Sequence, residues 1–148
     1  MDRPFVIENA RERKRLQTLV AGLTEEDLAL PMGTDWTVAI ALTHLATWDQ
    51  RAFVLMCKWK EDGVSPNPLD IDVFNETLLP LWSALPPRTA TGLALSAAEA
   101  IDQELENAPD WLIRDIEKLG ETYRLYRSEH RKLHLDEIEK TLGGKKKV

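Results

Sequence analysis

Residues 37–56, TVAIALTHLATWDQRAFVLM, decide the fold of this chain. The stretch contains no glycine or proline, and its apolar residues cover nearly every side when it is drawn as a helix. A helix of this kind is either enclosed by other elements of its own chain or covered partly by a second subunit. We therefore predict a long buried helix at 36–59, around which the other elements pack.

The rest of the sequence also favours helices, with breaks at glycine and proline. We predict principal helices at 4–21, 36–59, 89–107 and 121–142, and shorter helical pieces at 24–28, 69–85 and 111–116. Gly143 is expected to stop the last helix, so that residues 143–148 form a flexible tail. No convincing pair of strands is present. The predicted fold is all-α, a single four-helix bundle domain over residues 1–142 with short extra helices in its connections.

Composition excludes several classes of protein. The chain has 148 residues and a net charge of -6, with acidic and basic residues interspersed up to the lysines at 145–147. That pattern argues against a nucleic-acid-binding surface, which needs a basic stripe. We expect no membrane association and no export signal, because no apolar run is long enough. The single cysteine, Cys57, cannot form an internal disulfide, which suits the reducing cytoplasm.

The three histidines of the chain are its strongest functional signal. His130 and His134 lie four residues apart in the last predicted helix, so they leave one face and can bind one cation together. His44, from the helix at 36–59, can complete a three-nitrogen site with an open coordination position. Spacing alone leaves two alternatives: a hydrogen-bonded core histidine at position 44, and a chance His-x-x-x-His pattern on a charged helix.

Helical geometry indicates which side chains surround these histidines. Glu137 is either a hydrogen-bond acceptor for a ligand imidazole or a surface carboxylate. Arg51 and Arg127 either anchor an anionic substrate or form ordinary salt bridges. Asp49 points to another side of its helix than His44 and is interpreted as structural. Aromatic residues at helical spacing line a pocket or pack in the core; they are Trp48, Tyr123 and Tyr126.

Three segments resemble a known family. WTVAIALTHLATWDQR at 36–51 resembles helix two of the DinB-like superfamily, which includes the DinB and YfiT-like metal-dependent hydrolases and the amino-terminal domain of mycothiol-dependent maleylpyruvate isomerase. GLTEEDL at 22–28 is similar to the turn that follows helix one in that group. HRKLHLDEIEKTL at 130–142 resembles its fourth helix. The order and separation of these motifs match over nearly the whole chain.

The resemblance implies a four-helix bundle with up-down-down-up connectivity. It also implies a divalent metal, zinc or nickel, bound by His44, His130 and His134. Relatives in this superfamily form homodimers and use low-molecular-weight thiols such as mycothiol, bacillithiol or glutathione. The middle of the chain, at about 65–120, matches the family only in pattern, and this region should supply much of the pocket wall. The resemblance therefore leaves the substrate open.

These observations lead to a functional hypothesis and two alternatives. The leading hypothesis is a metal-dependent enzyme of the thiol-transferase or hydrolase type, acting on a small molecule. The alternatives are a non-catalytic, stress-related metal-binding dimer and a bundle that sequesters a small molecule. If the imidazoles have their ordinary pKa near 6.5, acidification below about pH 6 should release the metal.

Overall fold

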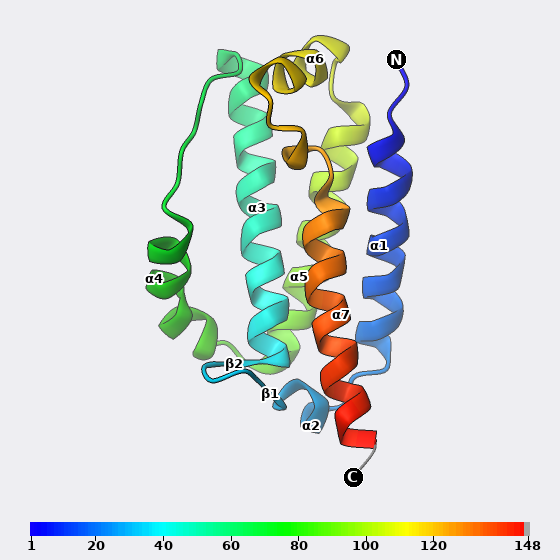
Figure 1. The fold of residues 1–148 in the computed structure, drawn as a ribbon, viewed down its shortest axis with the longest axis vertical. Coiled ribbons are helices and arrows are strands. Elements are labelled where there is room, and N and C mark those ends of the chain that lie inside the picture. The colour runs from blue at the N-terminus through cyan, green and yellow to red at the C-terminus, as the bar shows by residue number, and fades with distance from the viewer. Residues whose placement is uncertain (147–148) are drawn as a thin grey trace.

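The computed structural model describes residues 1–146, which are mainly helical (Figure 1). The long helices are α1 (Pro4–Ala21), α3 (Val38–Asp62), α5 (Pro87–Asn107) and α7 (Arg127–Lys146). The shorter ones are α2 (Glu25–Leu28), α4 (Ile71–Ser83), α6 (Asp110–Leu119) and the 3₁₀ turn η1 (Thr122–Arg124). The predicted all-α class is confirmed. Within these residues no helix is long and apolar enough to cross a membrane.

A pair of very short strands was not predicted. β1 (Pro31–Met32) and β2 (Trp36–Thr37) pair in antiparallel register, with Met32 opposite Trp36. This pairing takes Trp36 out of the helix that the sequence predicts from residue 36. The helix instead begins at Val38, because the Thr37 side chain accepts a hydrogen bond from the Ile40 backbone N–H and caps it.

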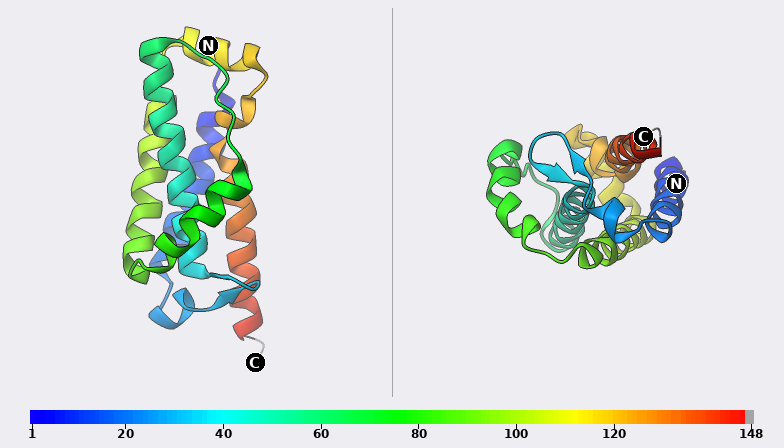
Figure 2. Two further views of the ribbon diagram at one scale, coloured as in Figure 1. Left: turned by 90° about the vertical axis from the view of Figure 1, so that its left-hand side faces the viewer. Right: turned by 90° about the horizontal axis from the view of Figure 1, so that it is seen from below.

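The long helices run in two directions (Figure 1). Asn9 contacts Ser128 near the start of α7, and further along Arg15 pairs with Asp136, so α1 and α7 are parallel. α3 and α5 are also parallel to each other and run the opposite way, with Lys60 near the end of α3 paired to a glutamate near the end of α5. Parallel neighbours need a crossover, which the segment at 63–86 provides, with α4 lying obliquely across α3 (Figure 2).

α3 is the central element of the hydrophobic core, as its sequence predicts. Its first half packs with buried residues of α1, α5 and α7, including Leu16, Ala94 and Ile138. Its second half contributes Met56 to another cluster, with partners that include Ile101 of α5. Each half of the helix thus lies against a different set of neighbours, and this packing explains why apolar residues occur on nearly all of its sides.

The last long helix begins six residues later than predicted, at Arg127 and not at Glu121. The reason lies in α1. The side chain of Asn9, only 1% exposed, donates to the Leu125 carbonyl and accepts from the Ser128 backbone N–H at 2.9 Å. It thereby satisfies a backbone donor that the first turn of a helix leaves open. This cap comes from a residue 119 positions away, so the local sequence does not reveal it.

The predicted stop at Gly143 is wrong. α7 continues through Gly143 to Lys146. Positive φ angles, which mark glycine stops, occur at Gly33, Gly63 and Gly120 in the described part of the chain. Residues 143–146 of the predicted flexible tail are therefore helical, and residues 147–148 lie outside the described residues.

A largely buried ion network joins all four long helices. Arg131 of α7 is fully buried and bonds to Asp49 of α3 and to Asp102 of α5, the latter at 2.8 Å from both of its Nη atoms. Arg127, one turn earlier, donates from Nε to Asp49 at 3.0 Å. Arg13 of α1 adds a second cation beside Asp102. Because each buried charge has a partner of opposite sign, removal of one leaves another uncompensated.

We expect the substitution Asp49→Asn to destabilise the protein strongly. It would leave Arg127 and Arg131 buried with one carboxylate between them, and broken buried pairs cost about 3 kcal/mol or more. Urea unfolding followed by circular dichroism measures the free energy of unfolding. The matched control is Asp136→Asn, which removes an exposed carboxylate paired with Arg15 and should cost about 1 kcal/mol or less. Equal losses in the two variants would contradict a stabilising role for the network.

Candidate metal centre

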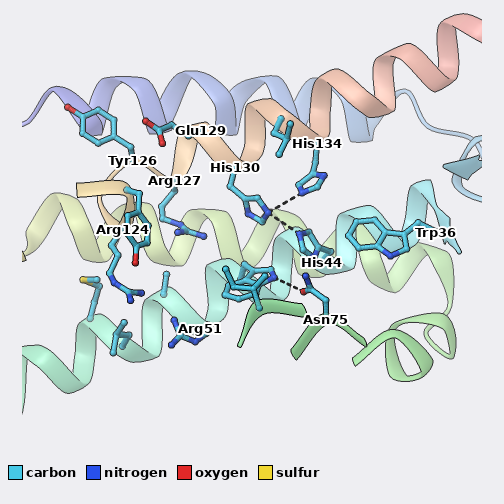
Figure 3. A pocket seen from close by; sticks show the side chains of 17 residues that line it. Trp36, His44, Arg51, Asn75, Arg124, Tyr126, Arg127, Glu129, His130 and His134 are labelled. Atoms are coloured by element: carbon cyan, nitrogen blue, oxygen red, sulfur yellow. Dashed lines mark hydrogen bonds between the residues drawn. The ribbon is translucent and has the colours of Figure 1, made fainter. Parts of the chain in front are cut away.

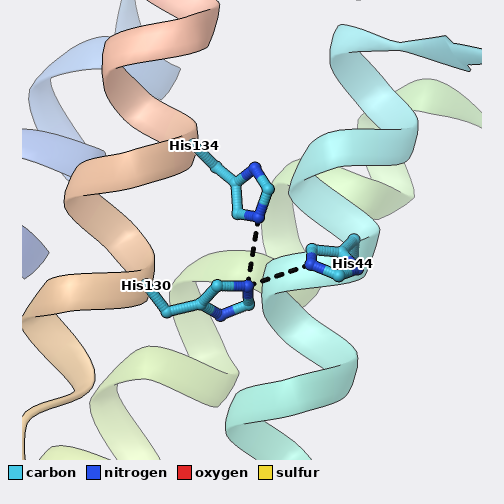
Figure 4. Close-up of side chains that lie close together, drawn as sticks. All are labelled: His44, His130 and His134. Carbon is cyan, nitrogen blue, oxygen red and sulfur yellow. Dashed lines mark hydrogen bonds between the residues drawn. The ribbon is translucent and has the colours of Figure 1, made fainter. Parts of the chain in front are cut away.

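The structure brings the three histidines together, as the sequence predicts. His44 projects from α3, and His130 and His134 project from successive turns of α7 toward it (Figure 4). The Nε2 atom of His130 lies 2.9 Å from Nε2 of His44 and 3.1 Å from Nε2 of His134. One nitrogen from each ring lies within 4.8 Å of the others, close enough for all three to bind one cation.

The hydrogen-bonding capacity of imidazole fits a cation at this point. Each neutral ring has one N–H donor and one lone pair. Nε2 of His130 faces the Nε2 atoms of both other histidines. It carries either one hydrogen or one lone pair, so it can form a hydrogen bond with only one of them. A cation accepts the lone pairs of all three. In a tetrahedral site with bonds of about 2.1 Å, ligand nitrogens lie about 3.4 Å apart, so only a small outward movement is needed.

Burial keeps these imidazoles neutral. Loss of hydration, with the nearby charges of the other histidines, lowers the pKa of His44 to about 3. Burial likewise lowers the pKa of His130 to about 3, again with a contribution from His134. The pKa of His134 is lowered by burial, which Glu137 opposes. The expectation of metal release below about pH 6 assumed ordinary pKa values, and the folded protein does not have them.

The Nδ1 atoms of His134 and His44 differ in their hydrogen bonding. Nδ1 of His134 lies 3.3 Å from the Glu137 carboxylate, the contact that the sequence suggested for a ligand imidazole. Nδ1 of His44 is buried and forms no hydrogen bond with the described residues. Trp36 packs on both of these histidines, with ring centroids 4.7 Å from His44 and 5.9 Å from His134. Trp82 of α4 meets the His44 ring edge-on at 5.5 Å.

A cavity of about 460 Å³ opens beside the histidines, between α3 and α7, with α4 along one side (Figure 3). All three histidines line it. So do the aromatic residues that the sequence singled out and the two arginines named with them: Trp48, Tyr123, Tyr126, Arg51 and Arg127. Tyr123 and Tyr126 lie before α7 begins and reach the cavity from η1 and the residues after it.

Several lining residues were not predicted from the sequence, among them Trp36, Asn75 and Arg124. Trp36 was assigned to the start of a helix, although the N-cap threonine at position 37 was a signal that it lies outside. Asn75 of α4 also lines the cavity and accepts a hydrogen bond from Trp48 Nε1 at 3.0 Å. Arg124 was predicted to lie in the long helix at 121–142 and instead belongs to the separate 3₁₀ turn η1. No local signal indicates Asn75, because its position depends on how α4 crosses α3.

Comparison with known proteins gives no family for this chain: no family model, no curated protein and no solved structure matches it.

The lowered pKa values predict how the stability of the metal-free protein depends on pH. The unfolded state takes up protons on its histidines below about pH 6.5, whereas folded His44 and His130 stay neutral to about pH 3. Between these values the unfolded state binds more protons, so stability rises with pH and is lost on acidification. The slope is about 1.4 kcal/mol per pH unit for each such histidine.

Urea unfolding at intervals from pH 7 to pH 4 measures this slope. The variant His130→Gln removes one of the two groups and should show a shallower loss, by about the contribution of one histidine. Carboxylates that titrate in the same range affect both proteins equally, so the difference between them isolates the imidazole. Identical slopes would show that His130 is protonated in the folded state as readily as in the unfolded one.

Proposed function

We propose that this chain is a metal-dependent enzyme of the thiol-transferase or hydrolase type and a member of the DinB-like superfamily. The observation that carries the proposal is the meeting of three Nε2 atoms from two helices at the wall of a cavity large enough for a small molecule. His44, His130 and His134 would bind one divalent cation, zinc or nickel. Imidazole nitrogens are suitable ligands for both ions.

The chain's own residues favour a strong Lewis acid. Three neutral imidazoles leave the full charge of a divalent cation uncompensated, and such an ion lowers the pKa of a bound water or thiol. Glu137 accepts a hydrogen bond from His134 Nδ1, which fixes the tautomer that presents the Nε2 lone pair. Trp36 covers the histidines on one side and limits access of water from that side. Substrates approach from the cavity.

The position of the cavity favours catalysis over storage of a metal. A structural site surrounds its ion with four protein ligands, whereas a catalytic site keeps a position open. Here the described residues offer three ligands, and the lining residues beside them are mainly apolar and aromatic. A small electrophile and a low-molecular-weight thiol are the proposed reactants. Cys57 does not replace the thiol, because it lies 13 residues after His44, about 20 Å along α3.

We further propose that the protein acts in the cytoplasm as a homodimer. The single cysteine is half-buried and without a disulfide partner, which suits a reducing compartment. Exposed apolar side chains, including Val54 of α3 and Leu93 of α5, offer surface for a second copy. Light scattering coupled to gel filtration measures the mass in solution.

We expect purified protein to contain about one divalent metal ion per chain, and the substitution His134→Ala to remove most of it. Loss of one of three ligands weakens binding sharply, whereas α7 keeps its helix because alanine is a good helix former. Elemental analysis measures the metal, and circular dichroism measures the helix content. The variant Glu137→Gln is the matched comparison: it leaves all three ligands and should weaken affinity by roughly 10- to 100-fold. Unchanged metal content in His134→Ala would remove this residue from the site.

Turnover separates an enzyme from a binding protein. With zinc or nickel bound, we expect steady consumption of a chromogenic electrophile, 1-chloro-2,4-dinitrobenzene, in the presence of a low-molecular-weight thiol, monitored by absorbance. The metal-free protein and His130→Gln should show only the uncatalysed rate. A single burst equal to the protein concentration would indicate sequestration of the compound. Absence of turnover with full metal occupancy, across several thiols and ester substrates, would favour a non-catalytic metal protein.

A further inference from the structure

Three arginines line the cavity on one side of the histidine cluster: Arg51 of α3, Arg124 of η1 and Arg127 of α7 (Figure 3). Two of them are already compensated. Arg124 forms an ion pair with Glu121, its neighbour in the same turn. Arg127 donates from Nε to the buried carboxylate of Asp49. The ordinary salt bridges that the sequence offered as an alternative therefore account for Arg127.

Arg51 has no such partner. Within the described residues no carboxylate lies within ion-pair distance of its guanidinium, and Nη2 donates only to the backbone and side-chain oxygens of Asn67. The guanidinium lies 5.9 Å from the centroid of the Trp48 ring. Burial, and next the charge of Arg124, lower the pKa of Arg51. A half-buried cation with cationic neighbours and a neutral partner is a favourable place for an anion.

The position of Arg51 on α3 determines how far it lies from the histidines. Arg51 follows His44 by seven residues, so both leave the same face of α3 two turns apart, about 10 Å along the helix axis. The Trp48 ring lies between them, with its centroid 6.3 Å from that of the His44 ring and 5.9 Å from the Arg51 guanidinium. The other apolar lining residues of α3, Ala52, Leu55 and Met56, come after Arg51 along the helix. The one acidic residue among the described lining residues, Glu129, is exposed. Along α3 the cavity wall therefore runs from the imidazoles over the Trp48 ring to Arg51, and continues with apolar residues beyond that arginine.

We infer that this cavity binds an elongated molecule whose carboxylate pairs with Arg51, whose apolar or aromatic stem lies along α3, and whose reacting atom lies at the histidines about 10 Å away. Only the placement of the reacting atom at the histidines rests on the proposed function. A carboxylate binds a guanidinium through two parallel hydrogen bonds and would displace the Asn67 contacts. Either reactant, the thiol or the electrophile, can carry that carboxylate.

The test compares two thiols on the zinc-loaded protein by calorimetry. The probe 8-mercaptooctanoate has a sulfur at one end and a carboxylate at the other, at about the required separation, and 1-octanethiol lacks the carboxylate. We expect Arg51→Gln to weaken binding of 8-mercaptooctanoate by about tenfold or more, the range for a charge-assisted hydrogen bond, and to leave 1-octanethiol within about twofold. Arg51→Lys keeps the charge without the paired geometry and should give an intermediate affinity.

Two controls make the result specific. Arg114→Gln removes the same charge from the exposed face of α6, outside the cavity, and should not change either affinity. The shorter 3-mercaptopropionate cannot reach from the histidines to Arg51 and should be insensitive to Arg51→Gln. Equal weakening of both long thiols, or no weakening of either, would overturn the inference. If the protein still binds about one zinc ion per chain in that case, the proposed metal site is unaffected.

A second titration does not depend on metal. Octanoate and octanol are added to the metal-free protein, and the fluorescence of the tryptophans beside the cavity is followed. Tighter binding of octanoate that disappears in Arg51→Gln supports the anion site even if the chain retains no zinc. Equal binding of the two compounds overturns it.

Steady-state kinetics of the same variant identify which reactant carries the carboxylate. If the thiol carries it, Arg51→Gln raises the Michaelis constant for the mercapto acid and leaves that for the electrophile unchanged. If the electrophile carries it, the increase is seen with a carboxylate-bearing electrophile such as 4-chloro-3,5-dinitrobenzoate. Unchanged constants for both reactants would contradict the pairing with Arg51.

Discussion

The contact on which the rest of this structure depends is the buried pairing of Asp49 with Arg127 and Arg131. Asp49 belongs to α3, which carries His44, and the two arginines lie on α7 on either side of His130. Charged groups at this depth are tolerated only with fixed partners, so the network permits one register between the two helices. The same contact that joins α3 to α7 therefore also sets how far apart the imidazoles stand.

Burial determines the chemistry that these imidazoles can perform. A histidine at the surface would be partly protonated near neutral pH, and a protonated ring cannot bind a metal. The packing of Trp36 and Trp82 around His44 removes water and favours the uncharged ring. The neutral rings then have nitrogen lone pairs that can bind a cation. On acidification the unfolded chain takes up protons on its histidines and the folded protein does not, so the free energy of unfolding decreases.

The cavity separates two kinds of positive charge. At the histidines the proposed cation would be bound by neutral nitrogens, and two helical turns away Arg51 carries a permanent charge with only a neutral partner. Between them lies the Trp48 ring, an apolar surface that displaces water and strengthens electrostatic interactions on both of its sides. A molecule with one anionic end and one reactive end would match this arrangement better than a small symmetrical one.

Much of this protein was determined by sequence pattern alone. The apolar run at 37–56 requires a buried helix, and four-residue spacing places His130 and His134 on one face of α7, whatever the tertiary structure. The resemblance implied that His44 joins them at one metal ion. Spacing could not establish this, because α3 and α7 are more than 60 residues apart.

Only the tertiary structure decided where α7 begins, since the cap is supplied by Asn9 from α1. It also decided which arginine lacks a carboxylate. Arg51 and Arg127 look alike in the sequence, and Asp49 lies closer along the chain to Arg51. On the helix, however, Asp49 faces α7 and pairs with Arg127, which leaves Arg51 to the cavity. Pairing of charges depends on distances in the folded protein, which are not encoded in local periodicity.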